Sequence, residues 1–309
     1  MKRMLLSLLA VLAACLTGYA QPVPVDTVPF RLGADRRMYV ELRVNNDTMP
    51  FRFLVDTGAT DVVLNARSPR VAGAVRFAGE ALNGGANSTE RVSMTDGTQR
   101  LRLGHTWVDS LRFIAIPYPP DAWDGVLGLS CLRRFLVRVS YAERAIYLYS
   151  PADSLAPAGA ECLPMDYRLG VPVVPVRVAF MGEAYDVWLE VDTGSDRVID
   201  LNTPFVERHG LRGRQAPFAI SSLSGTTQTG GRLENVYFDS VSVGGLSLPR
   251  VPGALSGIRV GVQASAEMDG VMGSNFLQRF DQVYDFRRGR LYLTVNDRLY
   301  TPFYDFLVQ

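Results

Sequence analysis

The segment FRFLVDTGATDVVLN, Phe51 to Asn65, places a carboxylate at the end of an apolar run that is typical of a buried strand. Five mostly apolar residues lead directly to Asp56, and a Thr, a Gly and a second apolar run follow it. The segment DVWLEVDTGSDRVIDLN, at 186–202, repeats this arrangement around Asp192, 136 residues later. A buried charge is costly unless it is paired, so both Asp residues require a structural or a functional reason.

A second pair of matching blocks follows the two segments. DGVLGLSCLRRFLVRVSYAERAIYLY, at 124–149, aligns without gaps with DGVMGSNFLQRFDQVYDFRRGRLYLT, at 269–294. Each half also opens with an alternating or β-branched run that predicts a strand, at 38–46 and at 171–180. Self-similarity at this domain-sized interval predicts two related lobes.

The composition along the chain predicts five parts. They are a signal segment at 1–20, a first lobe at 28–150, a linker at 151–161, a second lobe at 162–297 and a short aromatic tail at 298–309. The linker is rich in Pro, Ala, Ser and Gly. The sequence pattern predicts strands over most of both lobes, and it predicts one short helix after each DGV block. The fold class is therefore mainly β.

The N-terminal segment predicts export. Lys2 and Arg3 form a basic start, and the apolar run from Met4 to Leu16 is too short to span a bilayer comfortably. Signal-peptide cleavage after Ala20 is the favoured form of processing, and lipidation of Cys15 in LAAC is the alternative. Both outcomes place the protein in the periplasm or at the cell surface, with a membrane attachment only if Cys15 is lipidated.

Charge and metal-ligating residues argue against several function classes. The 309 residues carry a net charge of +1, and no basic cluster suggests a nucleic-acid partner. Two His and three Cys show no zinc-binding spacing, so we expect no metal and no cofactor.

Cys131 and Cys162 could form a disulfide in an oxidising compartment. Alternatively, they are two small buried apolar residues.

The two Asp-Thr-Gly segments also carry a family resemblance. DTGAT and DTGSD, each followed downstream by two apolar residues and a Gly (VLG at 126–128 and VMG at 271–273), resemble aspartic proteases. The pattern is similar to exported bacterial retropepsin-like proteins in which one chain supplies both halves of the site. The resemblance covers residues 28–297 and implies a bilobal pepsin/retropepsin-like fold, with two related β-barrel-like lobes and a cleft between them.

Each segment has residues suited to hold a tight turn. A glycine lets the backbone turn and approach closely, and a threonine hydroxyl can donate and accept hydrogen bonds that lock the turn. The four predicted support residues are Thr57, Gly58, Thr193 and Gly194.

A two-fold relation of the lobes would bring Asp56 and Asp192 together as the catalytic pair. Two carboxyl groups in contact do not both ionise easily, so they share one proton. The ionised member can take a proton from water, and the protonated member can polarise a peptide carbonyl. The alternative is that each Asp caps its turn by accepting local backbone N–H bonds. The duplicated arrangement favours the catalytic pair.

Two glycine-rich stretches are candidate flaps over a bound peptide. They are 80–93, with Gly84 and Gly85 as substrate-binding candidates, and 220–233, with Ser224 and Gly225. The resemblance implies such hairpins, which would cover an extended peptide in the cleft. Ordinary hairpin turns are the alternative. The first stretch lacks the Tyr that pepsin-like enzymes usually keep, which favours the retropepsin-like comparison.

We therefore expect an exported aspartic endopeptidase that acts on a peptide or protein substrate. A monomer is expected because one chain contains both halves of the site. The alternative is a non-catalytic peptide-binding protein on the same bilobal scaffold. The presence of both Asp residues favours the enzyme.

Overall fold

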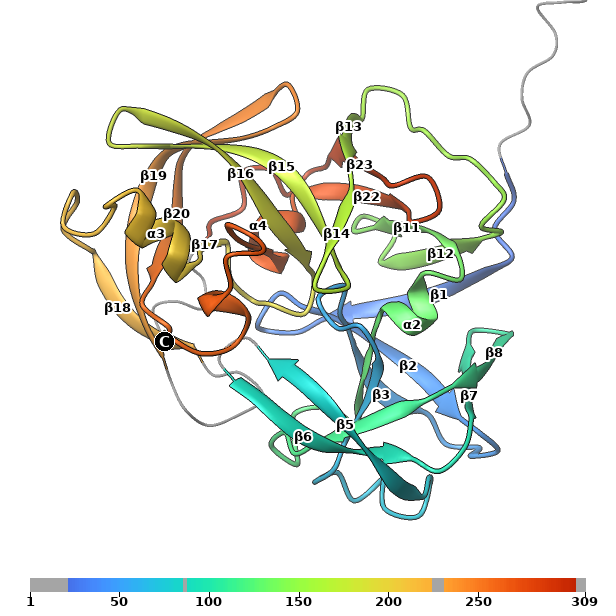
Figure 1. The fold of residues 1–309 in the computed structure, drawn as a ribbon. Coiled ribbons are helices and arrows are strands. Elements are labelled where there is room, and N and C mark those ends of the chain that lie inside the picture. The colour runs from blue at the N-terminus through green and yellow to red at the C-terminus, as the bar shows by residue number, and fades with distance from the viewer. Residues whose placement is uncertain (1–21, 86–87, 224–230, 304–309) are drawn as a thin grey trace, which may run out of the picture.

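Alternating apolar residues form strands with one buried face. MYVELRV forms β2 (Met38–Val44), in which every second side chain is buried. The computed structural model describes residues 22–85, 88–223 and 231–303, and strands build two lobes (Figure 1). The predicted signal segment at 1–20 lies outside these residues. In the described part, no helix is long and apolar enough to cross a bilayer.

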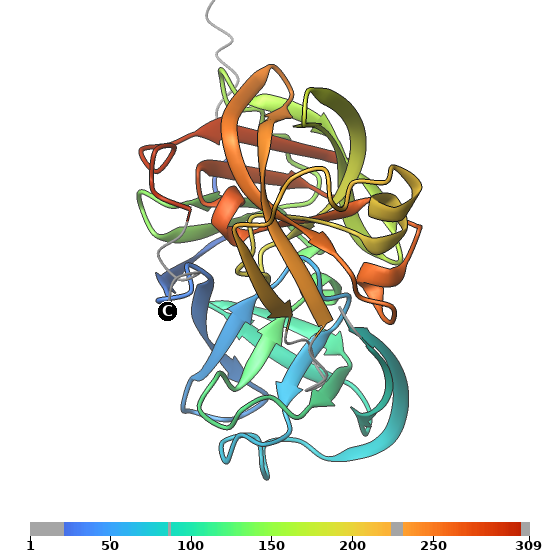
Figure 2. The same cartoon turned by 90° about the vertical axis from the view of Figure 1, so that its left-hand side faces the viewer.

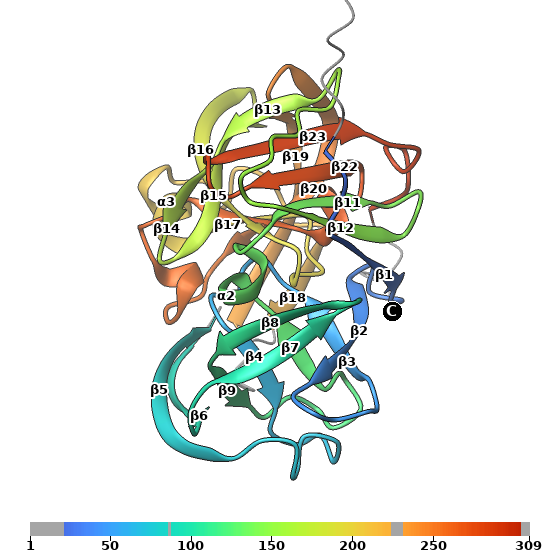
Figure 3. The ribbon, with the colours of Figure 1, turned by 90° about the vertical axis from the view of Figure 1, so that its right-hand side faces the viewer.

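A six-stranded sheet joins the two lobes, and Figure 3 shows its strands stacked one above another. The first and last strands of each half pair with each other, and the halves meet at β11 and β22. In spatial order the strands are β13 (Glu161–Pro164), β23 (Arg290–Val295), β22 (Phe280–Asp285), β11 (Leu136–Ser140), β12 (Ala145–Tyr149) and β1 (Asp26–Leu32).

The register at the centre of this sheet shows how the lobes are related. Arg138 of β11 pairs with Val283 of β22, and these two residues occupy the same position in the aligned blocks. The flanking pairs, Val137 with Tyr284 and Val139 with Gln282, are arranged symmetrically about it. An approximate two-fold axis therefore passes through the Arg138–Val283 pair.

In the first lobe, a strand from the later block lies between the two strands that flank the Asp-Thr-Gly turn. β10 runs parallel to β3 and antiparallel to β4. All residues of β10 are buried, because neighbouring strands and core cover both faces. The lobe also contains β3 (Phe51–Val55), β10 (Gly125–Leu127), β4 (Val62–Asn65), β9 (Phe113–Ile116), β6 (Ser88–Thr95), β5 (Phe77–Gly85), β7 (Gln99–Leu103) and β8 (Thr106–Leu111).

The second lobe repeats this insertion, and Figure 2 shows it stacked on the first lobe. β21 runs parallel to β16 and antiparallel to β17. The lobe consists of β14 (Asp166–Arg168), β15 (Val171–Phe180), β16 (Glu183–Asp192), β21 (Gly270–Gly273), β17 (Ile199–Leu201), β20 (Leu246–Ser256), β19 (Gly231–Val243) and β18 (Ala219–Leu223). One continuous cluster of buried apolar side chains runs through both lobes.

The predicted short helix follows each inserted strand. These helices are α2 (Leu129–Leu132) and α4 (Ser274–Leu277), and the second lobe also contains α3 (Thr203–Arg208) and the 3-10 helix η1 (Val262–Ala264). Cys131 is buried on α2 and Cys162 is exposed on β13, and both are free thiols. No disulfide joins them, and the expectation of a buried apolar role holds for Cys131 alone.

Each inserted strand ends in a glycine that touches the Asp-Thr-Gly turn. A Cβ added to Gly128 would lie 2.0 Å from the Asp61 carbonyl oxygen, and one added to Gly273 would lie 2.4 Å from that of Arg197. Leu129 N donates to Ala59 O at 2.8 Å just beyond the contact. The backbones therefore approach too closely for any side chain.

Gly128→Ala tests this close approach. The obstructing atom belongs to the backbone, so the strand or the turn must move. We expect the free energy of unfolding, measured by urea denaturation, to fall by about 1 to 3 kcal/mol, the usual cost of over-filling a packed site. Gly84→Ala is the control, because a Cβ there meets no described atom within 4 Å. Equal stability of the two variants would contradict the prediction.

Candidate active site

Each Asp-Thr-Gly segment forms a turn that is fixed by the inserted strand. The Asp56 N–H donates to Leu127 O of β10 at 3.1 Å. In the second lobe, Asp192 is the last residue of β16 and pairs with Gly273 of β21. Both Asp residues therefore stand at the ends of central strands, where the backbone has little freedom.

Reciprocal hydrogen bonds between Thr57 and Thr193 join the two turns. The Thr57 N–H donates to Thr193 Oγ1 at 3.0 Å, and the Thr193 N–H donates to Thr57 Oγ1 at 3.1 Å. The Thr57 hydroxyl donates to Val191 O at 2.5 Å, and the Thr193 hydroxyl donates to Val55 O at 2.9 Å. Both Thr residues are buried, where an unpaired polar group would be costly. This exchange locks the two turns together.

The joined turns bring the Asp56 and Asp192 carboxyl groups into hydrogen-bond contact. Each carboxyl lies against the glycine of the opposite turn. A Cβ on Gly194 would lie 2.3 Å from Asp56 Cγ, and one on Gly58 would lie 2.7 Å from Asp192 Cγ. The structure therefore gathers the two predicted catalytic residues and their four predicted support residues in one place.

Burial raises the pKa of both carboxyl groups. For Asp56, hydrogen bonds from Asp192 and from its own turn, together with the charge of Arg37, oppose the rise in pKa. For Asp192, the charges of Asp56 and Glu190 add to the effect of burial and raise the pKa further. This environment favours the shared proton on Asp192 and the negative charge on Asp56.

Arg37 reaches the second turn from the first lobe. It donates to Gly194 O at 3.0 Å and forms an ion pair with Asp35 at 2.7 Å. Its guanidinium lies 4.9 Å from the centre of the Trp123 ring. The sequence analysis missed Arg37, because it lies outside both Asp-Thr-Gly segments and reaches the site only through the tertiary fold.

A cleft of about 460 Å³ lies beside the pair of turns. Gly58 and Asp61 of the first turn, Gly84 of the β5–β6 hairpin and Glu190 of the second lobe line it. Neither Asp56 nor Asp192 lines this cleft or a larger hollow of about 650 Å³ on β1 and β2. The smaller cleft is the candidate because Gly58 of the first Asp-Thr-Gly segment and Glu190 line it.

Of the four predicted flap residues, the structure describes two, Gly84 and Gly85. Gly84 faces the cleft, and Gly85 ends β5, where it pairs with Ser88 of β6. Strands β18 and β19 form the corresponding hairpin of the second lobe. Ser224 and Gly225 lie outside the described residues.

Two comparisons with known proteins agree with this geometry. Residues 40–134 match the sequence model of a family described as gag-polyprotein putative aspartyl protease. Among solved structures, the chain is similar to the crystal structure of the aspartic proteinase from Irpex lacteus, with a TM-score of 0.57 and 13% identity. That likeness covers 89% of this chain and 98% of the other. This is the aspartic protease fold.

The family match covers much of the first lobe and includes Asp56, and the structural likeness extends over both lobes. Together they support the predicted resemblance to aspartic proteases and a protease-type function. No curated protein matches the sequence. The mainly β, bilobal fold expected from the sequence is confirmed.

Within this aspartic protease fold, the sequence analysis overlooked a third carboxyl group, that of Glu190. Glu190 is 5% exposed and precedes Asp192 by two residues on β16, so both side chains point to the same face. Burial and the charge of Asp56 raise the pKa of Glu190 to about 8. The sequence contained a sign of this residue. An acid at 190 interrupts the apolar run before Asp192, whereas the corresponding residue before Asp56 is the apolar Leu54.

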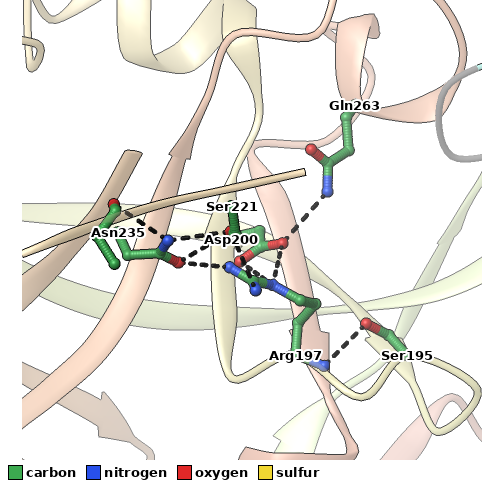
Figure 4. A network of polar contacts seen from close by, with 7 residues as sticks. Ser195, Arg197, Asp200, Ser221, Asn235 and Gln263 are labelled. Carbon is green, nitrogen blue, oxygen red and sulfur yellow. Dashed lines mark hydrogen bonds and ion pairs between the residues drawn. The ribbon is translucent and has the colours of Figure 1, made fainter. Parts of the chain in front are cut away.

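A buried polar network supports the second turn of this fold (Figure 4). Arg197 Nε binds the two carboxylate oxygens of Asp200 at 3.0 and 3.2 Å. Arg197 Nη2 donates to Asn235 Oδ1 at 2.8 Å, and Asn235 Nδ2 donates to Ser221 Oγ at 3.0 Å. The Arg197 N–H donates to Ser195 Oγ at 3.3 Å. The network therefore connects the turn to the β18–β19 hairpin.

Removing one member of the Arg197–Asp200 pair should destabilise the protein. Asp200→Leu leaves Arg197 buried without its counter-ion, and we expect the free energy of unfolding to fall by about 3 to 5 kcal/mol. The double variant Arg197→Met with Asp200→Leu should recover part of this loss. Asp186→Asn, which breaks the exposed pair with Arg177, is the control and should change nothing measurable. Urea denaturation that finds the single Asp200 variant as stable as wild type would contradict the prediction.

The raised pKa of Glu190 predicts a pH-dependent stability. Its ordinary pKa of 4.5 rises to about 8 in the folded protein, so the folded state binds this proton more tightly than the unfolded state. The resulting stabilisation is complete below the ordinary value and is lost as the pH rises through the folded value. Wild type should therefore lose stability relative to Glu190→Gln over this window. Urea denaturation at several pH values measures the difference, and a difference independent of pH would refute the assignment.

Proposed function

We propose that the protein is an exported aspartic endopeptidase that uses Asp56 and Asp192 to activate a water molecule. The observation that carries this proposal is the contact of the two carboxyl groups, which the Thr57–Thr193 exchange holds at the junction of the lobes. Asp56 and Asp192 are both only partly buried as residues. The aspartic protease fold supports the same reaction class.

The division of charge between the two carboxyl groups gives each a role. Ionised Asp56 takes a proton from the attacking water, and protonated Asp192 transfers its proton to the oxygen of the scissile carbonyl. The water oxygen bonds to the carbonyl carbon, which gives a tetrahedral diol. Asp56 then gives its proton to the amide nitrogen while Asp192 takes a proton from a diol hydroxyl, and the C–N bond breaks to release an acid and an amine. The residues of this chain suffice for these steps without a cofactor.

The cleft suits a peptide or protein substrate. The β5–β6 hairpin contributes Gly84 to the lining of the cleft, and the second lobe contributes Glu190. An extended peptide can bind there through its main chain and place alternate side chains in pockets. One chain supplies both Asp residues, so a monomer suffices for activity.

Export is part of the proposal. The basic start and short apolar run of residues 1–20 support translocation, and cleavage after Ala20 would release the mature chain. Lipidation at Cys15 would instead anchor the protein to a membrane. The site of action would then be the periplasm or the cell surface.

The proposal predicts that both Asp residues are required for cleavage. The mature protein, Asp56→Asn and Asp192→Asn would each be incubated with a diverse peptide mixture from about pH 3 to 8, and products would be read by mass spectrometry. We expect each variant to lose at least about 100-fold in cleavage rate. Asp186→Asn, an exposed change with the same chemistry, should cleave like wild type.

The pH profile checks the shared proton. Activity requires one ionised and one protonated carboxyl group, so the rate should rise as the first proton leaves and fall as the second leaves. Because the pKa of Asp192 is raised, this decline should come at higher pH than for an ordinary carboxyl group. Cleavage that survives either Asp substitution would contradict the mechanism. Binding of peptides without cleavage would favour the non-catalytic peptide-binding protein.

A further inference from the structure

Glu190 has the geometry of a side chain that meets a ligand. It is 95% buried, yet it lines the cleft beside the paired turns. A Cβ on Gly58 would lie 2.9 Å from Glu190 Oε1, which places the carboxyl directly behind the first turn. The corresponding residue of the first lobe, Leu54, is buried and apolar, so the acid is specific to one half of the site.

The Glu190 carboxyl has no hydrogen-bond or ion-pair partner among the described residues. Other buried acids of this lobe are paired. Asp200 binds Arg197, and Asp285 binds Arg288 at 3.0 Å. A buried carboxyl without a partner is costly. A ligand that supplies the missing partner would remove this cost.

The remaining charge in the cleft has the same sign. Asp61 is the other acid in the lining, and the described lining contains no Lys, Arg or His. Most of the other walls are apolar or small, among them Val63, Ile114 and Met268. In the part of the chain that the structure describes, no group of three acidic, His or Cys side chains could hold a metal ion. The cleft therefore fits an organic cation on an aliphatic stem.

We propose that Glu190 is a specificity-determining residue that selects peptides with an Arg or Lys side chain next to the scissile bond. This inference rests on the proposed function, because it names the substrate class of the same cleft. The aliphatic stem of such a side chain would pack against the apolar walls while its charged head meets the carboxyl. A bidentate Arg–carboxylate pair would also satisfy both Glu190 oxygens.

The groups that face Glu190 make this recognition selective. The charge of Asp56 acts on it and Asp192 lies on its own strand, and both are acids. The pKa of Glu190 is raised by burial and by Asp56, so the empty site holds this acid neutral. A cationic side chain favours the ionised form, and its binding would release the proton to solvent. An acidic side chain would find no basic partner in the described lining of the cleft.

Binding of two uncleavable peptides tests the proposal. Both are hydroxyethylene isosteres of one sequence, and they differ only in Arg or norleucine beside the isostere, tried on each side. Fluorescence anisotropy with the mature chain gives the ratio of their affinities. We expect wild type to favour Arg on one side. Glu190→Gln should reduce that preference by about tenfold to a hundredfold, the range expected for a hydrogen bond to a charged group.

Two further variants sharpen the result. Glu143→Gln, which removes an exposed acid paired with Arg138, is the matched control and should keep the wild-type ratio. Glu190→Leu copies the residue of the first lobe and should favour norleucine. It also replaces Glu190→Gln if that variant fails to fold. No preference for Arg on either side, or the same ratio in wild type and in the Glu190 variant, would overturn the proposal.

Cleavage of the matching natural peptides is measured separately. An Arg preference in binding without any cleavage would reject the protease and keep the selectivity. Cleavage without an Arg preference would keep the protease and reject the role of Glu190. If Glu190 only tuned the proton affinity of the Asp pair, its substitution would change both affinities equally, and the unchanged ratio would also overturn the proposal.

Discussion

The hydrogen-bond exchange between Thr57 and Thr193 is the interaction on which the rest of this structure depends. Two carboxyl groups in contact repel each other whenever both ionise, so a rigid frame must hold them together. The exchange supplies that frame. Each hydroxyl accepts a hydrogen bond from the Thr N–H of the opposite turn and donates one to a carbonyl of the strand that leads into that opposite turn. It requires the two turns to face each other about a two-fold axis. The register of β11 and β22 provides the same relation in the shared sheet.

The departures from two-fold symmetry give the two carboxyl groups different properties. Arg37 favours the charge on Asp56, while Glu190 stands beside Asp192 and disfavours a second negative charge there. A perfectly symmetric site would hold the proton equally on both. The asymmetry favours the proton on Asp192, and Glu190 is left as an acid without a partner among the described residues. Glu190 stands where the first lobe has Leu54. In our proposal this one difference both tunes the Asp pair and selects the substrates that the cleft accepts.

Much of the fold and the central pair could be predicted because their signals are local or repeated. The apolar runs before Asp56 and Asp192 predicted buried strands, and a short helix was predicted after each of the two DGV blocks. Other features could not be predicted. The Arg197–Asp200–Asn235 network joins the loop after β16 to strands β17 and β19, and the free state of Cys131 and Cys162 depends on their positions in the folded chain.

The sequence by itself determined the two lobes, the strand that leads into each Asp and the glycines that the turns require. These follow from alternation, from repetition and from the limited conformations that a tight turn allows. Only the tertiary structure decided what surrounds the Asp pair. Arg37 acts through space, and neither spacing nor composition encodes that distance. The spacing places Glu190 on the same face of its strand as Asp192, but only the tertiary structure shows that Glu190 is buried and that the charge of Asp56 acts on it. Burial then sets their effect, because the strength of a charge depends on how little water remains around it.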